Sequence, residues 1–192
     1  MKKKSWLILI SIWILLIGGY ITSRYYQIKR NVSPSMKQTL WLVKVGDRNI
    51  KRGDYIVAKF HDYRMQDPYD YEFIVKQIGG IAGDHIYVTN QKGFIKQLPV
   101  PNKYSWIYTV NNESYPVFNY LGMHKFTPLT TTDLVIPANY LFVHGNSNPT
   151  FDSRYKEFGL ISESQIFGKA YPIANIILNQ NEIKKPDERL LY

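Results

Sequence analysis

A lysine between two isoleucines is the first feature of this sequence that could carry chemistry. Residues two apart on a strand share a face, so Lys76 would lie between Ile74 and Ile78 on an apolar face. Burial disfavours the charged amine and lowers its pKa, and only a neutral lysine can accept a proton. At the ordinary pKa of about 10.4, deprotonation at pH 7 would cost about 5 kcal/mol. The spacing fits a general base, but taken alone it is more typical of a lysine that extends its amine into solvent at a strand edge.

A possible nucleophile lies in the segment Asn31–Met36, which reads NVSPSM. Pro34 fixes its own φ angle and restricts Ser33, so the turn is stiff. A stiff turn can hold the hydroxyl of Ser35 in one place. Composition alone is more typical of a simple linker beside a membrane.

A third segment, from Gly145 to Arg154, contains Asp152 and Arg154 close together in a turn-rich loop. One interpretation is a surface loop with a local ion pair, which contributes little to stability. The other is that Asp152 and Arg154 support a site while Thr150 or Ser153 orients a nearby amine.

The elements that must position these residues are short strands. Runs rich in Val, Ile, Tyr and Phe recur at Leu40–Val45, Tyr55–Phe60, Phe73–Ile78, His85–Thr89 and Asn139–Val143. Turn residues separate the runs, and no long amphipathic helix follows. This pattern predicts a mainly β domain, barrel-like or sandwich, over residues 25–192. Residues from about 90 to 133 are more polar and carry four prolines, so we expect a small inserted subdomain there.

Residues 1–24 are expected to form a charged tip and a transmembrane anchor. The run Ser5–Ser23 has no charged residue and is about long enough to cross a hydrocarbon core. A cleavable signal peptide is the alternative, but the apolar run is longer than such a segment requires and no clear cleavage site follows. Basic residues flank both ends in nearly equal number, so charge barely favours a cytoplasmic N-terminus.

Composition narrows the possible partners and cofactors. The formal net charge is +9, and its basic clusters flank the apolar run, where lipid headgroups would lie. No nucleic-acid recognition motif accompanies this charge, so nucleic acid is not an expected partner. The chain has no cysteine, and its four histidines lack the spacing of metal ligands. We therefore expect neither a metal nor another cofactor.

The order of the motifs along the chain resembles that of type I signal peptidases. The matching segments are Ser33-Pro34-Ser35-Met36, Lys51-Arg52-Gly53-Asp54, the run from Val75 to Asp84, the run from Phe151 to Arg154 with Gly159, and Gly168-Lys169-Ala170. They span most of the chain, and the lysine and Asp-Ser-Arg segments are the most specific. The resemblance implies a mostly antiparallel β catalytic domain with a smaller inserted subdomain.

The resemblance also implies roles for individual residues. It makes Ser35 the nucleophile and Lys76 the general base of a Ser/Lys dyad. Ser33 would help to form the oxyanion hole, and Thr150 would hydrogen-bond the lysine amine. Asp152, Ser153 and Arg154 would shape the site from behind.

Several residues depart from the pattern that the family usually shows. Lys37 stands where a proline is usual, Gln77 where an arginine is common, and Thr150 where a serine is typical. The segment His144-Gly145-Asn146 is also degenerate. The short insertion and the residues after Ser35 resemble the peptidases of conjugation and type IV secretion systems, which process pilin precursors.

The resemblance implies a serine endopeptidase that removes signal peptides by cutting after small residues. Its partners would be precursor proteins, membrane lipid and possible secretion or conjugation machinery. Its location would be the inner membrane, as a single-pass protein with the catalytic domain on the outer face. One alternative is a non-enzymatic, membrane-anchored component of a secretion apparatus. Another is a self-cleaving repressor relative, which the apolar anchor disfavours.

Overall fold

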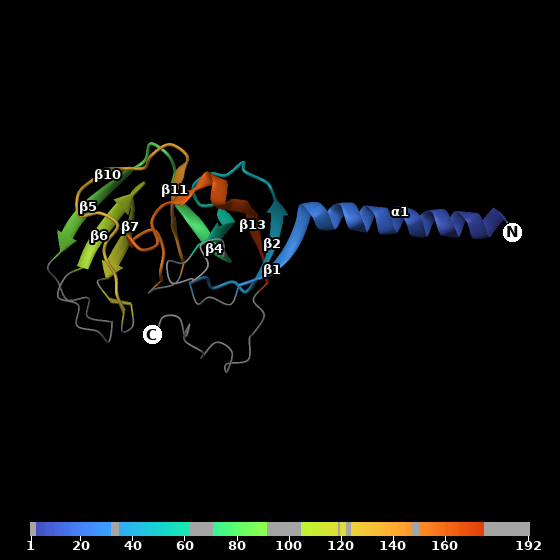
Figure 1. The fold of residues 1–192 in the computed structure, drawn as a ribbon, viewed down its shortest axis with the longest axis horizontal. Coiled ribbons are helices and arrows are strands. Elements are labelled where there is room, and N and C mark those ends of the chain that lie inside the picture. Colours follow the sequence, from blue (N-terminus) through green and yellow to red (C-terminus); the bar gives the residue numbers. More distant parts are fainter. Residues whose placement is uncertain are drawn as a thin grey trace.

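The N-terminal apolar segment forms one long helix. The computed structural model describes residues 3–31, 35–61, 71–91, 105–118, 120–121, 124–146 and 150–174. Helix α1 (Lys3–Tyr25) projects away from the β-rich body, and its apolar side chains are exposed (Figure 1). Its Ile8–Tyr25 portion is long and apolar enough to cross a membrane. The helix covers the predicted anchor and fits a single-pass membrane protein.

The main sheet begins directly where α1 ends. Its seven strands lie in the order β1-β2-β13-β3-β4-β11-β12, and neighbours pair antiparallel. Their bounds are β1 Tyr26–Arg30, β2 Leu40–Val45, β3 Tyr55–Phe60, β4 Glu72–Gly80, β11 Tyr140–His144, β12 Ile161–Ser162 and β13 Ile166–Ala174. A short 3-10 helix, η1 (Glu163–Gln165), links the last two strands. The order is open-ended, with β1 and β12 at its edges, so this sheet is not a closed barrel.

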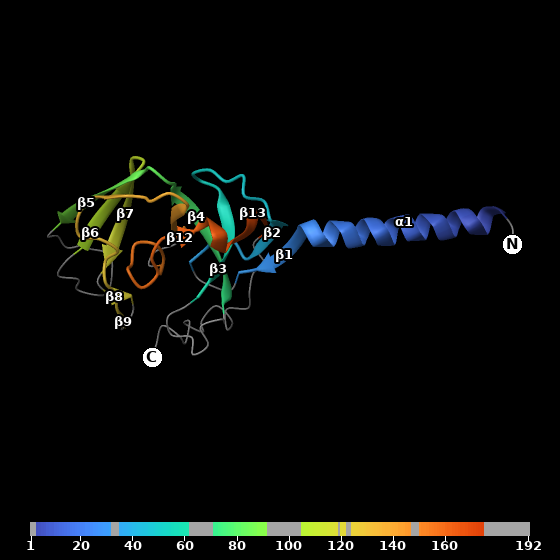
Figure 2. The ribbon, with the colours of Figure 1, turned by 45° about the horizontal axis from the view of Figure 1, so that its top comes forward.

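A second sheet lies at the end of the body farthest from α1, as both ribbon views show (Figures 1 and 2). It has the order β10-β5-β6-β7. The strands are β5 (His85–Gln91), β6 (Ser105–Val110), β7 (Glu113–Phe118) and β10 (Leu134–Val135). A small pair, β8 (Tyr120–Leu121) and β9 (His124–Lys125), follows β7. The sheet overlaps the stretch from about 90 to 133 that we expected as an insertion, of which residues 92–104 lie outside the described part.

Three buried clusters hold the body together. One contains Ile86, Tyr108 and Val117 of the second sheet together with Phe142 of β11, so it joins the two sheets. Another lies on β3, β4 and β11 and includes Ile56, Ile78 and Val143. The third includes Met36, Trp41 and Val75. The mainly β, antiparallel fold expected from the sequence is confirmed.

The predicted strands agree closely with the observed ones. The runs Leu40–Val45 and Tyr55–Phe60 coincide with β2 and β3. The runs at Phe73–Ile78, His85–Thr89 and Asn139–Val143 correspond to β4, β5 and β11 with shifts of one or two residues at their ends. Strand β4 therefore carries Lys76 as predicted. The division of the chain into an anchor, a catalytic domain and an insertion stays a prediction.

Candidate active site

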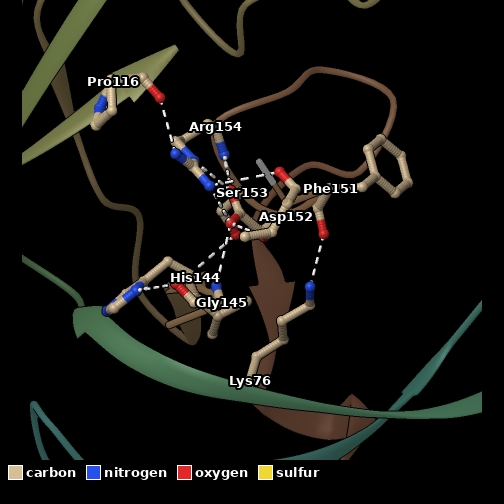
Figure 3. A network of polar contacts seen from close by, with 10 residues as sticks. Lys76, Pro116, His144, Gly145, Phe151, Asp152, Ser153 and Arg154 are labelled. Carbon is tan, nitrogen blue, oxygen red and sulfur yellow. Dashed lines mark hydrogen bonds and ion pairs between the residues drawn. The ribbon is translucent and has the colours of Figure 1, made fainter. Parts of the chain in front are cut away.

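Lys76 points from strand β4 into the protein interior. Its side chain is 4% exposed, and its register partner on β3 is the fully buried Ile56. The amine Nζ donates a 2.6 Å hydrogen bond to the backbone oxygen of Phe151 (Figure 3). The Phe158 ring also lies 5.5 Å from Nζ. The predicted burial of this lysine is confirmed, and its amine is held by one carbonyl and one aromatic face.

The surroundings of Lys76 favour its neutral form. Burial lowers the pKa of Lys76 to about 8, while the Asp152 carboxylate acts in the opposite direction. About one such lysine in ten would be neutral at pH 7, compared with fewer than about one in a thousand at the ordinary pKa. The amine can therefore lose its proton, and so become a base, at a small cost.

Asp152 and Arg154 form a buried ion pair behind this lysine. Their side chains are 0% and 2% exposed, and the guanidinium contacts the carboxylate through Nε and through one terminal nitrogen, each at 2.8 Å. Another guanidinium nitrogen donates to the Pro116 oxygen at 2.8 Å. Burial alone would raise the pKa of Asp152, but Arg154 and the hydrogen bonds around the carboxylate lower it to about 2. The ion pair is therefore buried in the protein interior and is not an exposed surface contact.

The Asp152 carboxylate organises the loop that contains it. Its Oδ2 accepts hydrogen bonds from the Thr150 hydroxyl at 2.5 Å and from the Gly145 backbone N–H at 3.1 Å. Ser153 joins the same loop to β11, because its hydroxyl accepts from the Val143 N–H at 3.1 Å and its own N–H donates to the Val143 oxygen at 3.1 Å. Figure 3 shows this network above the lysine. The loop is thus fixed by buried polar contacts.

Ser35 meets this network at Gly145. The serine is 5% exposed, and a Cβ atom placed on Gly145 would lie only 2.4 Å from the Ser35 backbone oxygen. In the pairing of β11 with β4, Val143 lies opposite Ile78 and His144 opposite Gln77. The residues that come next, after His144 and before Gln77, are Gly145 and Lys76. Gly145 therefore packs against Ser35 and lies one residue beyond the last printed pair, at the end of the ladder nearest Lys76.

The remaining predicted residues have different outcomes. Ser33 lies outside the described residues. Thr150 is buried, and its hydroxyl donates to Asp152, while the Lys76 amine donates to the Phe151 oxygen. The suggested role of Thr150 in orienting the lysine stays a prediction. Asp152, Ser153 and Arg154 lie together behind the site.

Sequence reasoning missed several contacts of the site. The carbonyl of Phe151 and the ring of Phe158 touch the lysine amine, and no residue-type pattern marks a backbone carbonyl or a lone ring in advance. His144 was noted only as a departure from the family. Its ring lies against the Tyr115 ring in a tilted arrangement, with 4.7 Å between centroids, and burial lowers the pKa of His144. Its Nδ1 lies 3.0 Å from the backbone oxygen of Gly145.

The described part of the chain contains no cluster of His, Cys, Asp or Glu that could hold a metal ion. Among the buried residues of the site, Ser35 contributes a hydroxyl and Lys76 an amine. These are the groups of nucleophilic catalysis.

Comparison with known proteins gives one family. The family model described as signal peptidase, peptidase S26, matches residues 2–174, from the start of the anchor to the last strand of the main sheet. A search of curated proteins finds no match. The match covers most of the chain, including every segment described above. The chain therefore belongs to the signal peptidase family, peptidase S26.

Proposed function

We propose that Ser35 is the nucleophile and Lys76 the general base of a peptide-bond hydrolase that removes signal peptides. The observation that carries this proposal is that Ser35 and Lys76 are both buried, while Gly145 packs against Ser35 and directly follows His144, the partner of the residue next to Lys76. Membership of the family supports a serine peptidase whose substrates are precursors with signal peptides. The hydroxyl of Ser35 and the amine of Lys76 would be the two groups that perform the reaction.

The energy required to activate Lys76 is small. With a pKa of about 8, removing the proton at pH 7 costs about 1 kcal/mol instead of about 5 kcal/mol. No third residue is needed to take up a proton, because burial alone provides the shift. The Phe151 carbonyl accepts from the amine, which leaves the nitrogen lone pair to face a different direction once the amine is neutral.

In this mechanism the Ser35 Oγ attacks the scissile carbonyl while Lys76 Nζ takes the hydroxyl proton. The backbone N–H of Ser35 and the hydroxyl of Ser33 would donate to the oxyanion. Removal of one such donor typically slows the reaction by about 100- to 1,000-fold. Lys76 then gives its proton to the leaving amine, and a water molecule hydrolyses the ester on Ser35.

The buried residues behind the lysine would hold this geometry. Asp152 fixes the Gly145 N–H and the Thr150 hydroxyl, and Arg154 neutralises the carboxylate. Ser153 ties the loop to β11. Thr150 would come close enough to the amine to accept from it when substrate binds. These residues act through the position of the dyad and do not take part in bond breaking.

The anchor suggests where the reaction occurs. Strand β1 begins directly after α1, so the body lies within a short distance of the membrane exit. Precursors that are held by their own apolar segments would reach the same surface. We place the catalytic domain on the outer face of the inner membrane and infer cleavage after small residues. A narrower proposal is that the precursors are pilins or other proteins of a conjugation or type IV secretion system. The machinery of that system would then be a further partner.

The test is cleavage of a membrane-protein precursor by the full chain in detergent. Wild type should release the mature protein by a cut after a small residue. Ser35→Ala and Lys76→Ala should each lose at least about 1,000-fold, as triad variants do. The matched controls are the exposed Ser114→Ala and Lys156→Ala, which should cut at the wild-type rate.

The rival function is a non-enzymatic, anchored component of a secretion apparatus. It predicts that Ser35→Ala and Lys76→Ala leave export intact in cells. Equal cleavage by wild type and both variants would remove the dyad from consideration. Pilin and general precursors, offered in turn, would decide between the broad and the narrow substrate class.

A further inference from the structure

The side-chain amide of Asn146 joins two segments that lie 109 residues apart in the sequence. Its Oδ1 accepts a 2.8 Å hydrogen bond from the backbone N–H of Lys37, two residues after Ser35. Its Nδ2 donates a 3.1 Å hydrogen bond to the Oε1 of Gln38. The Lys37 N–H can only donate, so it fixes which side of the amide is oxygen. Both ends of the Asn146 amide are thus used on one short segment.

Residues on both sides of Lys37 are also held in place. Met36 is 4% exposed and packs in the cluster that contains Val75, the neighbour of Lys76. The backbone oxygen of Gln38 accepts a 3.2 Å hydrogen bond from the indole of the fully buried Trp41. Between these points, the Lys37 N–H depends on Asn146. Loss of this contact would free the backbone immediately after Ser35.

Asn146 is itself held by the buried network. It follows Gly145, whose N–H donates to Asp152 and whose α-carbon packs against the Ser35 oxygen. A continuous set of contacts therefore runs from Asp152 through Gly145 and Asn146 to Lys37. This set connects the loop behind Lys76 to the segment that carries Ser35.

We propose that Asn146 is a positioning residue, which sets the place of the Ser35 hydroxyl by holding the backbone at Lys37 and the side chain at Gln38. The proposal rests on the proposed role of Ser35. Reacting atoms must lie within about 3–3.5 Å of each other, and a displacement of about 1 Å can cost about 100-fold in rate. Asn146 would act on the rate of acylation and not on substrate binding.

The experiment compares kcat and KM for a synthetic precursor peptide with alanine at the first and third positions before the cut, using the full chain in detergent. Asn146→Ala removes both hydrogen bonds. Asn146→Asp keeps an acceptor for the Lys37 N–H, replaces the donor to Gln38 with a second acceptor oxygen, and adds a negative charge. Gln38→Ala removes the second contact from the other side. The exposed Asn49→Ala is the matched control, because it lies in the turn after β2, away from the site.

We expect Asn146→Ala to lower kcat by about 10- to 100-fold with KM within about twofold of wild type. Asn146→Asp should recover most of this loss, to within about fivefold of wild type. Gln38→Ala should cost about two- to fivefold, as one neutral hydrogen bond would. In the Asn146→Ala background it should cost nothing further, because its partner is already absent.

Two results would overturn this inference while leaving the dyad in place. One is a kcat for Asn146→Ala within twofold of the Asn49→Ala control when Ser35→Ala is inactive. The other is an additive loss in the double variant. If Asn146→Ala has a lower Tm than wild type, the inference is tested with Gln38→Ala and Asn146→Asp. Their kcat values are measured at a temperature at which both variants are fully folded. Cleavage by Ser35→Ala at the wild-type rate would instead contradict the proposed nucleophile.

Discussion

The backbone oxygen of Ser35 lies against the α-carbon of Gly145, where a Cβ atom would come within 2.4 Å of it. The same added atom would lie 2.7 Å from the Thr150 hydroxyl oxygen. Both distances are shorter than a methyl group tolerates beside an oxygen. Glycine is therefore required at position 145 for the two segments to approach each other.

Gly145→Ala is the first prediction. The added methyl group would push the Ser35 segment away from Lys76, so we expect kcat/KM to fall by about 100-fold or more. The matched control is Gly19→Ala in α1, where an added Cβ meets no atom within 4 Å. A wild-type rate for Gly145→Ala would show that the approach of the two segments is not needed for catalysis.

The pH dependence of kcat/KM should report the titration of Lys76. Its pKa in the folded protein is lowered to about 8 by burial, and the base that we propose is its neutral form. Activity should therefore rise tenfold per pH unit below pH 8 and level off above it. The measurement is kcat/KM for a precursor peptide from pH 6 to pH 10. A rate that is already constant below pH 7 would argue against Lys76 as the base.

Lys76→Met should make the folded protein more stable while abolishing cleavage. Because the folded pKa of about 8 lies below the unfolded value, burying the charged amine costs about 3 kcal/mol at every pH below 8. Loss of the hydrogen bond to Phe151 offsets about 1 kcal/mol of the stability gained by removing the buried charge. We expect Tm at pH 7 to rise by about 4–8 °C.

The pH dependence of that gain provides its control. The penalty of Lys76 shrinks as pH rises from 8 towards 10.5, where the lysine is neutral in both states. The Tm difference between Lys76→Met and wild type should shrink over the same range. An equal or negative difference at pH 7 would mean that burial of the amine costs the fold little.

Arg154→Met should be strongly destabilising. It leaves the Asp152 carboxylate buried without its cation, which typically costs about 3–5 kcal/mol. The comparison is Lys44→Met, whose amine pairs with Asp47 and is 46% exposed, so its loss should be far smaller than that of Arg154→Met. Urea unfolding of both variants measures the difference. Similar losses in the two variants would contradict a special role for burial.

Part of the fold could be predicted because apolar residues alternate with turn signals. The run Leu40–Val45 has apolar residues at most positions and became β2 without a shift. Strand β13 was not predicted, since its sequence includes Gly168, Lys169 and Pro172. Gly168 belongs in that strand because a Cβ atom would lie 2.2 Å from the Lys44 oxygen. Such a requirement exists only once β2 lies beside β13.

The hairpin of β6 and β7 was hidden for a similar reason. Pro116 lies within β7, and a proline is unusual inside a strand because it has no N–H to donate, so the sequence favours an irregular insertion here. The turn between the strands is Asn111-Asn112, in which both residues have positive φ angles. That pair is a hairpin signal in the sequence, and its neglect explains the missed strands.

The candidate site was only partly readable in the same way. The isoleucines on both sides of Lys76 indicated its burial, because side-chain direction alternates along a strand. The depth of Asp152 and Arg154 was not readable, since a turn-rich polar loop is usually exposed. Nothing in residue type distinguishes Asn146 from Asn148, the other asparagine of that loop. Its contacts to Lys37 and Gln38 depend on how distant segments pack.

The central claim is that Ser35 forms a covalent bond with the substrate when Lys76 takes its proton. The direct measurement is mass spectrometry of the full chain, mixed with a precursor peptide and quenched with acid within the first turnover. The account predicts an acyl adduct on the peptide that contains Ser35 in wild type, and none in Ser35→Ala or Lys76→Ala. An adduct on another residue, or cleavage that persists in Ser35→Ala, would contradict it.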